Sequence, residues 1–233
     1  MKKVEILFIS DVHLGSRGCN SDKLLEVLKE YEPQTLILVG DIIDGWLLKK
    51  RFFWTQSFTN VIRKILSYTK NGTQVIYVSG NHDEFLREYG DFDMGLNLSI
   101  VTEYQYNDIF ITHGDLYDGV VKLKWLGMIG SFGYDLAIYV DRKLKKYGLI
   151  KKKSLSKFLK DQVKEAVKFI TSFEDQIAYQ ANKRGCSTVV CGHIHNPVDK
   201  LIDNVRYLNC GDWIENNSYI TYNNGEFKLH RHQ

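Results

Sequence analysis

The sequence predicts a layered α/β fold, and three observations lead to this prediction. Short runs of Ile, Leu, Val and Phe have the length of buried strands, amphipathic segments separate the first of these runs, and polar motifs rich in Asp and His directly follow several of them. Ligands of open α/β sheets bind beyond the carboxyl ends of the strands, so motifs in this position indicate a functional site.

Strands and helices alternate through the first half of the chain. The apolar runs predict strands at residues 4–9, 36–39, 75–78 and 109–111. Ser21 is a suitable N-cap for a helix, because the apolar residues that follow it share one helical face: Leu24, Leu25 and Leu28. Pro33 ends that pattern before the second strand.

A second helix is predicted before the third strand. Its apolar residues follow i, i+3, i+4, i+7, i+8 spacing, which places them on one face: Phe58, Val61, Ile62, Ile65 and Leu66. Asn71-Gly72 supplies the C-terminal stop.

The second half of the chain departs from this alternation. Residues 158–185 carry apolar positions in helical register and residues 124–146 predict a further helix, whereas the next strand is expected only at residues 188–191. We therefore expect one domain over residues 1–233 with a helical insertion at about 118–185, a candidate lid or substrate-binding cap. Short strands should follow it at residues 205–208, 219–222 and 227–229.

Composition and charge are those of an ordinary globular chain. The 233 residues suit one domain, and 44% hydrophobic with 25% charged residues argue against long disorder. The net charge of +3 by itself predicts no nucleic-acid or membrane partner. However, nine of the nineteen residues at 142–160 are Lys or Arg and none is acidic. Such a run is either a solvated helix face or a surface for anionic lipid or phosphate.

Cysteine usage and hydropathy predict a cytoplasmic protein. The four cysteines form neither a CxxC pair nor a small-domain disulfide pattern, so reduced thiols are expected. The apolar run at residues 4–9 is too short for a secretory leader, and no stretch approaches the ~20 apolar residues of a membrane span. Any membrane contact should therefore be peripheral, at the inner face of the cytoplasmic membrane.

Seven residues in the polar motifs have side chains suited to divalent metals: Asp11, His13, Asp41, Asn81, His113, His193 and His195. In extended backbone, the i, i+2 spacing within Asp11-Val12-His13 and His193-Ile194-His195 turns both side chains of each pair to one side. Each motif alone is common in surface loops and turns, so the prediction depends on their joint order after strand-like runs. Mixed oxygen and imidazole ligation without thiolates argues against structural zinc.

The spacing predicts two metal-ligand shells that share one carboxylate. The first shell would contain Asp11, His13, Asp41 and His195. The second would contain Asp41, Asn81, His113 and His193. Asp41 is the expected bridge, because a carboxylate offers two oxygens to cations ~3.5–4 Å apart. We expect manganese first, with iron, zinc and cobalt as alternatives.

The full motif set resembles that of the calcineurin-like metallophosphoesterases. The resemblance spans residues 11–195 and is carried by these segments: Asp11-Val12-His13, Gly40-Asp41-Ile42-Ile43-Asp44, Gly80-Asn81-His82-Asp83-Glu84, His113-Gly114-Asp115 and Gly192-His193-Ile194-His195. It implies an αββα sandwich of two mixed sheets flanked by helices, with a dimetal centre at the loop ends. It also implies hydrolysis of phosphoesters or phosphorus anhydrides.

The resemblance also implies catalytic roles. Two adjacent dications lower the pKa of a bridging water and thereby provide a hydroxide that attacks phosphorus in line. In similar enzymes the residue at His82 binds the phosphate or protonates the leaving oxygen. We expect Asp83 to orient His82, and Asp44 either to support a metal ligand or to stabilise a turn.

Within the family, the arrangement is most similar to the UDP-2,3-diacylglucosamine diphosphatases, which release UMP and a lipid monophosphate in lipid A synthesis. Chain length, the insertion between His113 and His193, and the segment Asn209-Cys210-Gly211-Asp212-Trp213 carry this similarity. One residue departs from it, because in many of those enzymes Arg follows the motif Asn, whereas His82 stands here. A generic phosphodiesterase or phosphatase acting on another nucleotide or nucleic-acid substrate therefore stays open.

The insertion is the expected lipid contact. Apolar residues beside the basic run make residues 118–160 suitable for a phosphate-bearing lipid at a bilayer, and simple packing against the domain is the alternative. The sequence predicts no oligomeric state.

Other function classes fit less well. Nuclease relatives usually add a substantial C-terminal capping region, which disfavours a nucleic-acid partner. Protein phosphatases would carry an Arg that residues 40–45 lack. A non-enzymatic scaffold would have lost metal ligands, and all seven are present.

Overall fold

The computed structural model of the protein describes residues 1–89, 92–93, 97–117 and 153–232. The chain divides into two compact units, Met1–Leu116 with Gln176–Gln233, and Tyr117–Asp175. The helix predicted at residues 124–146, and with it most of the predicted insertion contact at 118–160, lies outside the described residues. The second predicted helix of the insertion is present as α5, Lys153–Lys183, which begins a turn earlier than expected.

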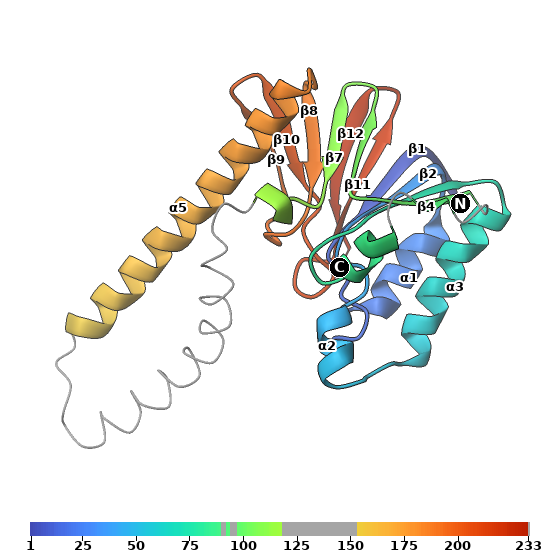
Figure 1. Cartoon of the computed structure of the whole chain (residues 1–233), viewed down its shortest axis with the longest axis horizontal. Coiled ribbons are helices and arrows are strands. Elements are labelled where there is room, and N and C mark those ends of the chain that lie inside the picture. Colours follow the sequence, from blue (N-terminus) through green and yellow to red (C-terminus); the bar gives the residue numbers. More distant parts are fainter. Residues whose placement is uncertain (90–91, 94–96, 118–152, 233) are drawn as a thin grey trace. The chain divides into compact units, whose positions relative to one another are not determined.

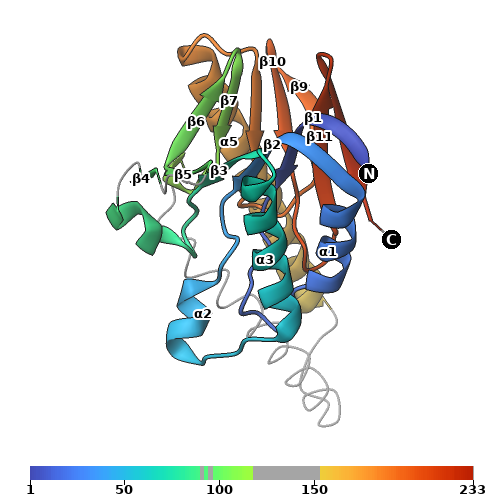
Figure 2. The same ribbon diagram turned by 90° about the vertical axis from the view of Figure 1, so that its right-hand side faces the viewer.

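The first unit contains two mixed β-sheets (Figures 1 and 2). The larger sheet has the order β12-β11-β1-β2-β3-β5-β4, with β1 Lys2–Ile9, β2 Tyr31–Val39, β3 Gln74–Val78, β4 Phe92–Asp93, β5 Leu98–Val101, β11 Ser218–Asn223 and β12 Glu226–Arg231. The smaller sheet has the order β6-β7-β8-β10-β9, with β6 Glu103–Tyr106, β7 Ile109–Thr112, β8 Thr188–Cys191, β9 Val198–Ile202 and β10 Val205–Asn209. The central strands of both sheets run parallel, so their carboxyl ends lie at one edge.

Strand β1 shows why the sheets form a sandwich, because both of its faces are buried. Leu7 and Ile9 belong to the apolar cluster between the larger sheet and its helices. Ile6 and Phe8 belong to a second cluster shared with the smaller sheet, which contributes Ile109, Ile111, Val190 and Leu208. Burial of each such side chain contributes roughly 1.5–3 kcal/mol. Sheet-on-sheet packing with helices on the outer face confirms the predicted layered architecture.

Helices α1 (Ser21–Glu30) and α3 (Gln56–Lys70) cover the larger sheet (Figure 2). Most of the predicted apolar faces are buried, including Leu24 and Leu28 on α1 and Phe58 and Val61 on α3, whereas Leu66 at the end of the predicted face is 43% exposed. The predicted N-cap at Ser21 is wrong by one position: Asn20 precedes α1 and Ser21 begins it. The Ser21 hydroxyl instead lies 2.8 Å from that of Ser57, which links α1 to α3.

The strand β2 begins earlier than predicted and runs through Pro33. Pro33 lies opposite Val4 of β1, whereas pairing with β3 begins only at Thr35. The chain therefore has a strand neighbour on one side only at Pro33, and a missing N–H is tolerated there. The helix α1 already ends at Glu30, and the proline lies within the strand that follows it.

Several short elements were not predicted. The strands β4, β5, β6 and β9 lie at or next to sheet edges, and β6 and β9 contain no fully buried residue, so they lack an apolar run. Helix α2 (Gly45–Lys50) and the 3₁₀ segments η1 (Glu84–Tyr89) and η2 (Asp115–Tyr117) follow the polar motifs. Among the described helices, none combines the length and hydropathy needed to cross a bilayer.

Candidate metal centre

The polar motifs meet where the loops beyond β1, β2, β3, β7 and β8 come together. Backbone pairing continues past the strand ends, since the amides of Asp11 and His13 donate to Gly40 O and Asp41 O at 3.0 and 2.9 Å. The Asp11 carboxylate accepts from the backbone N–H of His193 at 3.1 Å, and this bond joins the larger sheet to the smaller one. The site therefore depends on both sheets.

Five of the predicted ligands have left-handed backbone. The φ angles are 50° at Asp11, 54° at His13, 54° at Asp41, 71° at His193 and 53° at His195. The extended backbone predicted for the pairs Asp11/His13 and His193/His195 is therefore wrong, and the side chains converge through tight left-handed turns. Each such residue costs on the order of 1–2 kcal/mol, and strain of this kind clusters at functional sites.

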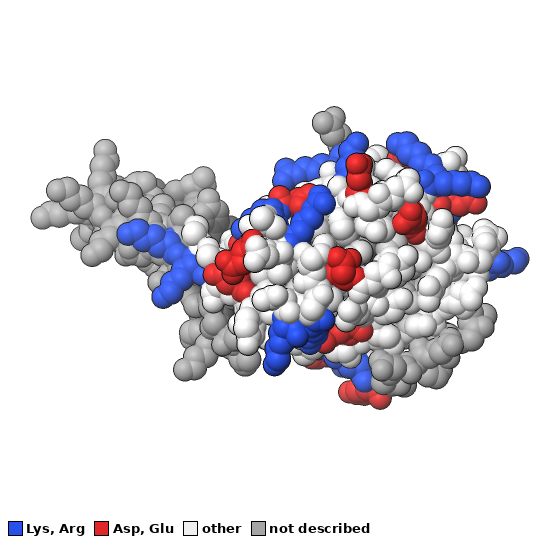
Figure 3. Space-filling model, turned by 90° about the horizontal axis from the view of Figure 1, so that it is seen from above, with Lys and Arg blue, Asp and Glu red and all other residues white. Residues whose placement is uncertain are grey.

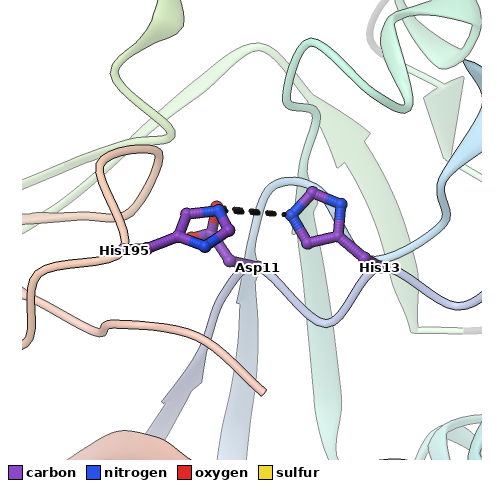
Figure 4. A group of neighbouring side chains, drawn as sticks. All are labelled: Asp11, His13 and His195. Carbon is purple, nitrogen blue, oxygen red and sulfur yellow. Dashed lines mark hydrogen bonds and ion pairs between the residues drawn. The ribbon is translucent and has the colours of Figure 1, made fainter. Parts of the chain in front are cut away.

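Asp11, His13 and His195 form the first group (Figure 4). The Asp11 carboxylate lies beside both rings: its Oδ1 is 3.1 Å from His195 Nε2 and 3.9 Å from His13 Nε2. The two Nε2 atoms are 3.3 Å apart. His13 Nδ1 lies 3.5 Å from Asp44, so its proton faces that carboxylate and the Nε2 lone pair faces the group.

Asp11, Asp41 and His113 form a second group, deeper in the protein. His113 Nδ1 is 2.9 Å from the carbonyl of Val39 and must donate to it, so Nε2 is directed at Asp41 Oδ2, 3.3 Å away. Next to this group, Oδ1 of Asn81 is buried and accepts no hydrogen bond from the described residues. A divalent cation bound here would satisfy this amide oxygen and would replace the proton between His113 Nε2 and Asp41.

The remaining predicted ligand, His193, lies beside these groups. Its ring centroid is 5.2 Å from that of His113, with the planes nearly perpendicular. All seven predicted ligands are thus brought to one region, although neither Asn81 nor His193 belongs to these two groups.

Two glycines make this close approach possible. A Cβ atom on Gly80 would overlap the Asp41 carboxylate, and one on Gly192 would overlap the Asp11 carboxylate and the Ser10 hydroxyl. Glycine before Asn81 and before His193 therefore leaves the space in which neighbouring ligands lie.

The buried carboxylates and imidazoles shift each other's protonation. Burial favours a raised pKa for both carboxyls, but His195 outweighs it at Asp11 and His113 outweighs it at Asp41, so both pKa values are lowered. Conversely, burial favours a lowered pKa for the imidazoles, yet Asp41 raises the pKa of His113, and Asp11 raises the pKa of His195 to about 9. A divalent cation that binds these imidazole nitrogens must therefore displace protons from them.

His82 lies at the open side of the site. Its Nδ1 is 3.1 Å from Asp44 Oδ1, its Nε2 is 3.9 Å from Asp41 Oδ2, and its side chain is partly exposed. The indole of Trp46 lies over the His82 ring, with centroids 4.3 Å apart. His82, His13 and Asp41 also lie close enough together to hold an ion, so distance alone does not separate a ligand role of His82 from a catalytic one.

Asp44, rather than Asp83, lies beside His82. The predicted contact between Asp83 and His82 is wrong, because Asp83 is buried and accepts from Ile42 N, Tyr77 Oη and Gly80 N at 2.8, 2.6 and 2.5 Å. Burial, assisted by the charge of Asp41, raises the pKa of Asp83. The side chain of Asp83 therefore joins the loops after β2 and β3, whereas Asp44 orients both His82 and His13.

We expect Asp83→Ala to destabilise the protein by about 3 kcal/mol, because three buried donors lose their acceptor. Urea unfolding of the purified protein measures this as a lower midpoint at unchanged slope. Glu88→Ala, an exposed change on η1, should shift the free energy of unfolding by less than about 0.5 kcal/mol. Equal stability of the two variants would contradict the structural role of Asp83.

Sequence reasoning missed several residues that support the site. Asp212 accepts from the amides of Ile214 and Glu215 at 2.7 and 2.6 Å and faces His195 Nδ1 at 4.0 Å. Arg87 donates to both oxygens of Asp115 at 2.9 Å and to Ser79 O at 2.8 Å. In the sequence, Asp212 belongs to a segment that is only similar to the family, and no helix is predicted at η1, so no local signal places Asp212 or Arg87 at the site.

The donor set fits two divalent metals. Hard carboxylate and amide oxygens are mixed with imidazole nitrogens, and the described cysteines lie in neither metal group. Bound cations would satisfy the Asn81 oxygen and would be held between His113 Nε2 and the Asp41 carboxylate.

Comparisons with known proteins agree with this chemistry. The family model for calcineurin-like phosphoesterases matches residues 4–197. A Porphyromonas gingivalis protein named UDP-2,3-diacylglucosamine hydrolase is 25% identical over 251 residues, covering 94% of each chain. A Neisseria gonorrhoeae protein of the same name is 27% identical over 117 residues, covering 46% of this chain and 47% of that protein.

Solved structures of similar fold include Yfce, a phosphoesterase from E. coli, with a TM-score of 0.47 and 16% identity over 98% of this chain and 99% of Yfce. The matched residues 4–197 cover most of the chain and contain all seven candidate ligands together with His82. The chain therefore belongs to the calcineurin-like phosphoesterases and is a metal-dependent phosphoester hydrolase.

Proposed function

We propose that the protein is a two-metal diphosphatase that cleaves the pyrophosphate of UDP-2,3-diacylglucosamine or a closely related nucleotide lipid. The observation that carries the two-metal part is the convergence of imidazole Nε2 atoms and buried carboxylates beside the unsatisfied oxygen of Asn81. The nucleotide-lipid part rests on the relatives named as hydrolases of that compound.

Asp11, His13, Asp41 and His195 would hold one ion, and Asp41, Asn81, His113 and His193 the other. Bound there, two divalent metals supply Lewis acidity and lower the pKa of water toward neutrality. Asp44 and the Val39 carbonyl fix the tautomers of His13 and His113, so that each presents a lone pair to the site. Manganese is our first choice among ions that accept such mixed ligands.

His82 would bind the phosphate or protonate the leaving oxygen. It lies on the exposed side of the site, and Asp44 and Trp46 hold its ring from two directions. Its pKa, which burial alone would lower, is raised because Asp44 and Asp41 are close. A protonated His82 Nε2 can donate to a phosphoryl oxygen or to the departing oxygen.

Hydrolysis of a different nucleotide phosphodiester is the second candidate, and His82 is the observation that favours it. Imidazole donates one proton where an arginine fork would grip a phosphate with two parallel bonds. A cytoplasmic location, with peripheral contact to the inner face of the membrane, is part of the first proposal only, since the nucleotide lipid has acyl chains.

The test is a parallel assay in manganese-supplemented buffer. We expect release of UMP from UDP-2,3-diacylglucosamine with kcat/KM at least about 10²-fold above that for bis-p-nitrophenyl phosphate, because remote binding energy of the larger substrate contributes to catalysis. Single-stranded DNA should stay uncut. Cleavage of the simple diester without UMP release would favour the second candidate, and chelation of metal should abolish either activity.

A further inference from the structure

The segment that follows the second metal-ligand loop combines exposed apolar and basic side chains. Residues 46–54 read Trp-Leu-Leu-Lys-Lys-Arg-Phe-Phe-Trp, and we call them the α2 segment because helix α2 supplies the first half. The metal site uses only Trp46 of these residues. The rest need a different explanation.

The apolar side chains of the α2 segment are unusually exposed. Phe52 is 76% exposed, Leu47 40% and Trp46 36%. The segment is nevertheless anchored, since the rings of Phe53 and Trp54 pack edge-on against Phe58 of α3, with centroids 5.9 and 5.5 Å away. A fixed segment that displays a phenylalanine and a leucine to solvent marks a contact surface.

Basic side chains predominate beside these apolar groups, although the Glu84 carboxylate accepts from Trp46 Nε1 at 3.1 Å. Lys49, Lys50 and Arg51 are exposed, and Arg17, also exposed, lies 5.1 Å from the Phe53 ring. The end of the sheets opposite α2 is different, because basic and acidic side chains lie interspersed there (Figure 3). The partner of the α2 segment should therefore be anionic as well as apolar.

A lipid surface fits both requirements. Aromatic and aliphatic side chains insert at the boundary between headgroups and acyl chains while Lys and Arg contact anionic headgroups. Nucleic acid could bind the cations through its phosphates and stack its bases on the aromatic rings. It would not explain the exposure of Leu47, because this side chain has no charge, no hydrogen-bonding group and no ring. We propose that the α2 segment docks the protein on an anionic lipid surface.

Docking through this segment would place the metal centre at that surface. The Asp44 carboxylate accepts from Leu47 N at 2.9 Å at the start of α2 and lies beside His82, and the Trp46 ring covers His82. The mouth of the site and the α2 segment are thus one continuous structure. The inference concerns a surface other than residues 118–160 and does not require the proposed substrate.

The test is co-sedimentation of the full-length protein with vesicles of phosphatidylglycerol and phosphatidylcholine, compared with phosphatidylcholine alone. Wild-type protein should bind the anionic vesicles, and Lys49→Gln/Lys50→Gln should bind about 30-fold more weakly, since each cation near such a surface contributes ~1 kcal/mol. Phe52→Ser should bind about tenfold more weakly. Turnover of the water-soluble bis-p-nitrophenyl phosphate should not change in either variant.

Matched controls separate the α2 segment from general charge and hydropathy. Lys70→Gln/Lys228→Gln removes the same charge from exposed positions on α3 and β12, and Leu201→Ser removes a side chain that is 70% exposed on β9. Both should bind vesicles within twofold of wild type. Absence of wild-type binding, or equal losses in the α2 and control variants, would overturn the inference. Vesicle binding needs no turnover, so this result is independent of the substrate assay.

Discussion

Asp41→Ala should remove both metals at once and reduce turnover by about 10³-fold or more, equivalent to roughly 4 kcal/mol of transition-state stabilisation. The reason is position: Asp41 Oδ2 lies 3.3 Å from His113 Nε2 and 3.9 Å from both His13 Nε2 and His82 Nε2, so it faces ligands of both proposed shells. Elemental analysis of the purified protein measures metal per chain, and a diester assay measures turnover.

A conservative variant separates this role from folding. Asp41 Oδ1 also accepts from the backbone N–H of His82 at 2.8 Å, and Asp41→Asn retains an acceptor for that bond. It should fold with a near-normal unfolding midpoint and still lose both metals, because a neutral amide does not bridge two dications. Asp175→Ala, at an exposed position on α5, is the control and should keep both metals. Two metals per chain in Asp41→Asn would refute the bridging role.

His82→Ala should retain both metals and reduce turnover by roughly 10²- to 10⁴-fold, the contribution expected of a positioned general acid. Its partly exposed ring lies on the open side of the site, whereas the imidazole of His113 is fully buried. Metal content and turnover are measured on the same sample. Loss of one metal would instead identify His82 as a ligand.

A comparison of two leaving groups distinguishes proton transfer by His82 from phosphate binding. If His82 protonates the departing oxygen, the loss in His82→Ala should be small for a p-nitrophenyl ester, whose leaving group needs no proton, and large for an alkyl phosphodiester. Equal losses for both substrates would indicate phosphate binding instead of proton transfer. His232→Ala, near the C-terminus and paired with Glu26, should leave both activities unchanged.

Much of the fold followed from local pattern. The buried strands β1, β2, β3, β7 and β8 have continuous apolar runs because both of their faces are covered, so their sequences carry a clear signal. Edge strands such as β6 and β9 have no such run. Pro33 was interpreted as a break because sequence alone does not show that β2 has one neighbour at that point.

The candidate ligands were also identifiable from the sequence, whereas their geometry was not. Each motif follows a strand, and parallel strands deliver their carboxyl ends to one edge, so the donor set could be predicted from order alone. The left-handed turns at Asp11 and His13 replace the extended backbone that simple alternation predicts. Such turns are set by bonds to the neighbouring loop, for example His13 N to Asp41 O, and not by the tripeptide itself.

The sequence by itself determined the chemistry of this protein: an α/β chain whose strand ends carry the carboxylates, amide and imidazoles of a metal-dependent phosphoesterase. Only the tertiary structure decided which side chains support them. Asp44 rather than the adjacent Asp83 orients His82, and Trp46 covers its ring. The physical reason is that the types of metal-donor side chain and their order along the chain are local properties of the sequence. The hydrogen-bonding partners of these side chains depend instead on packing between loops that are distant along the chain.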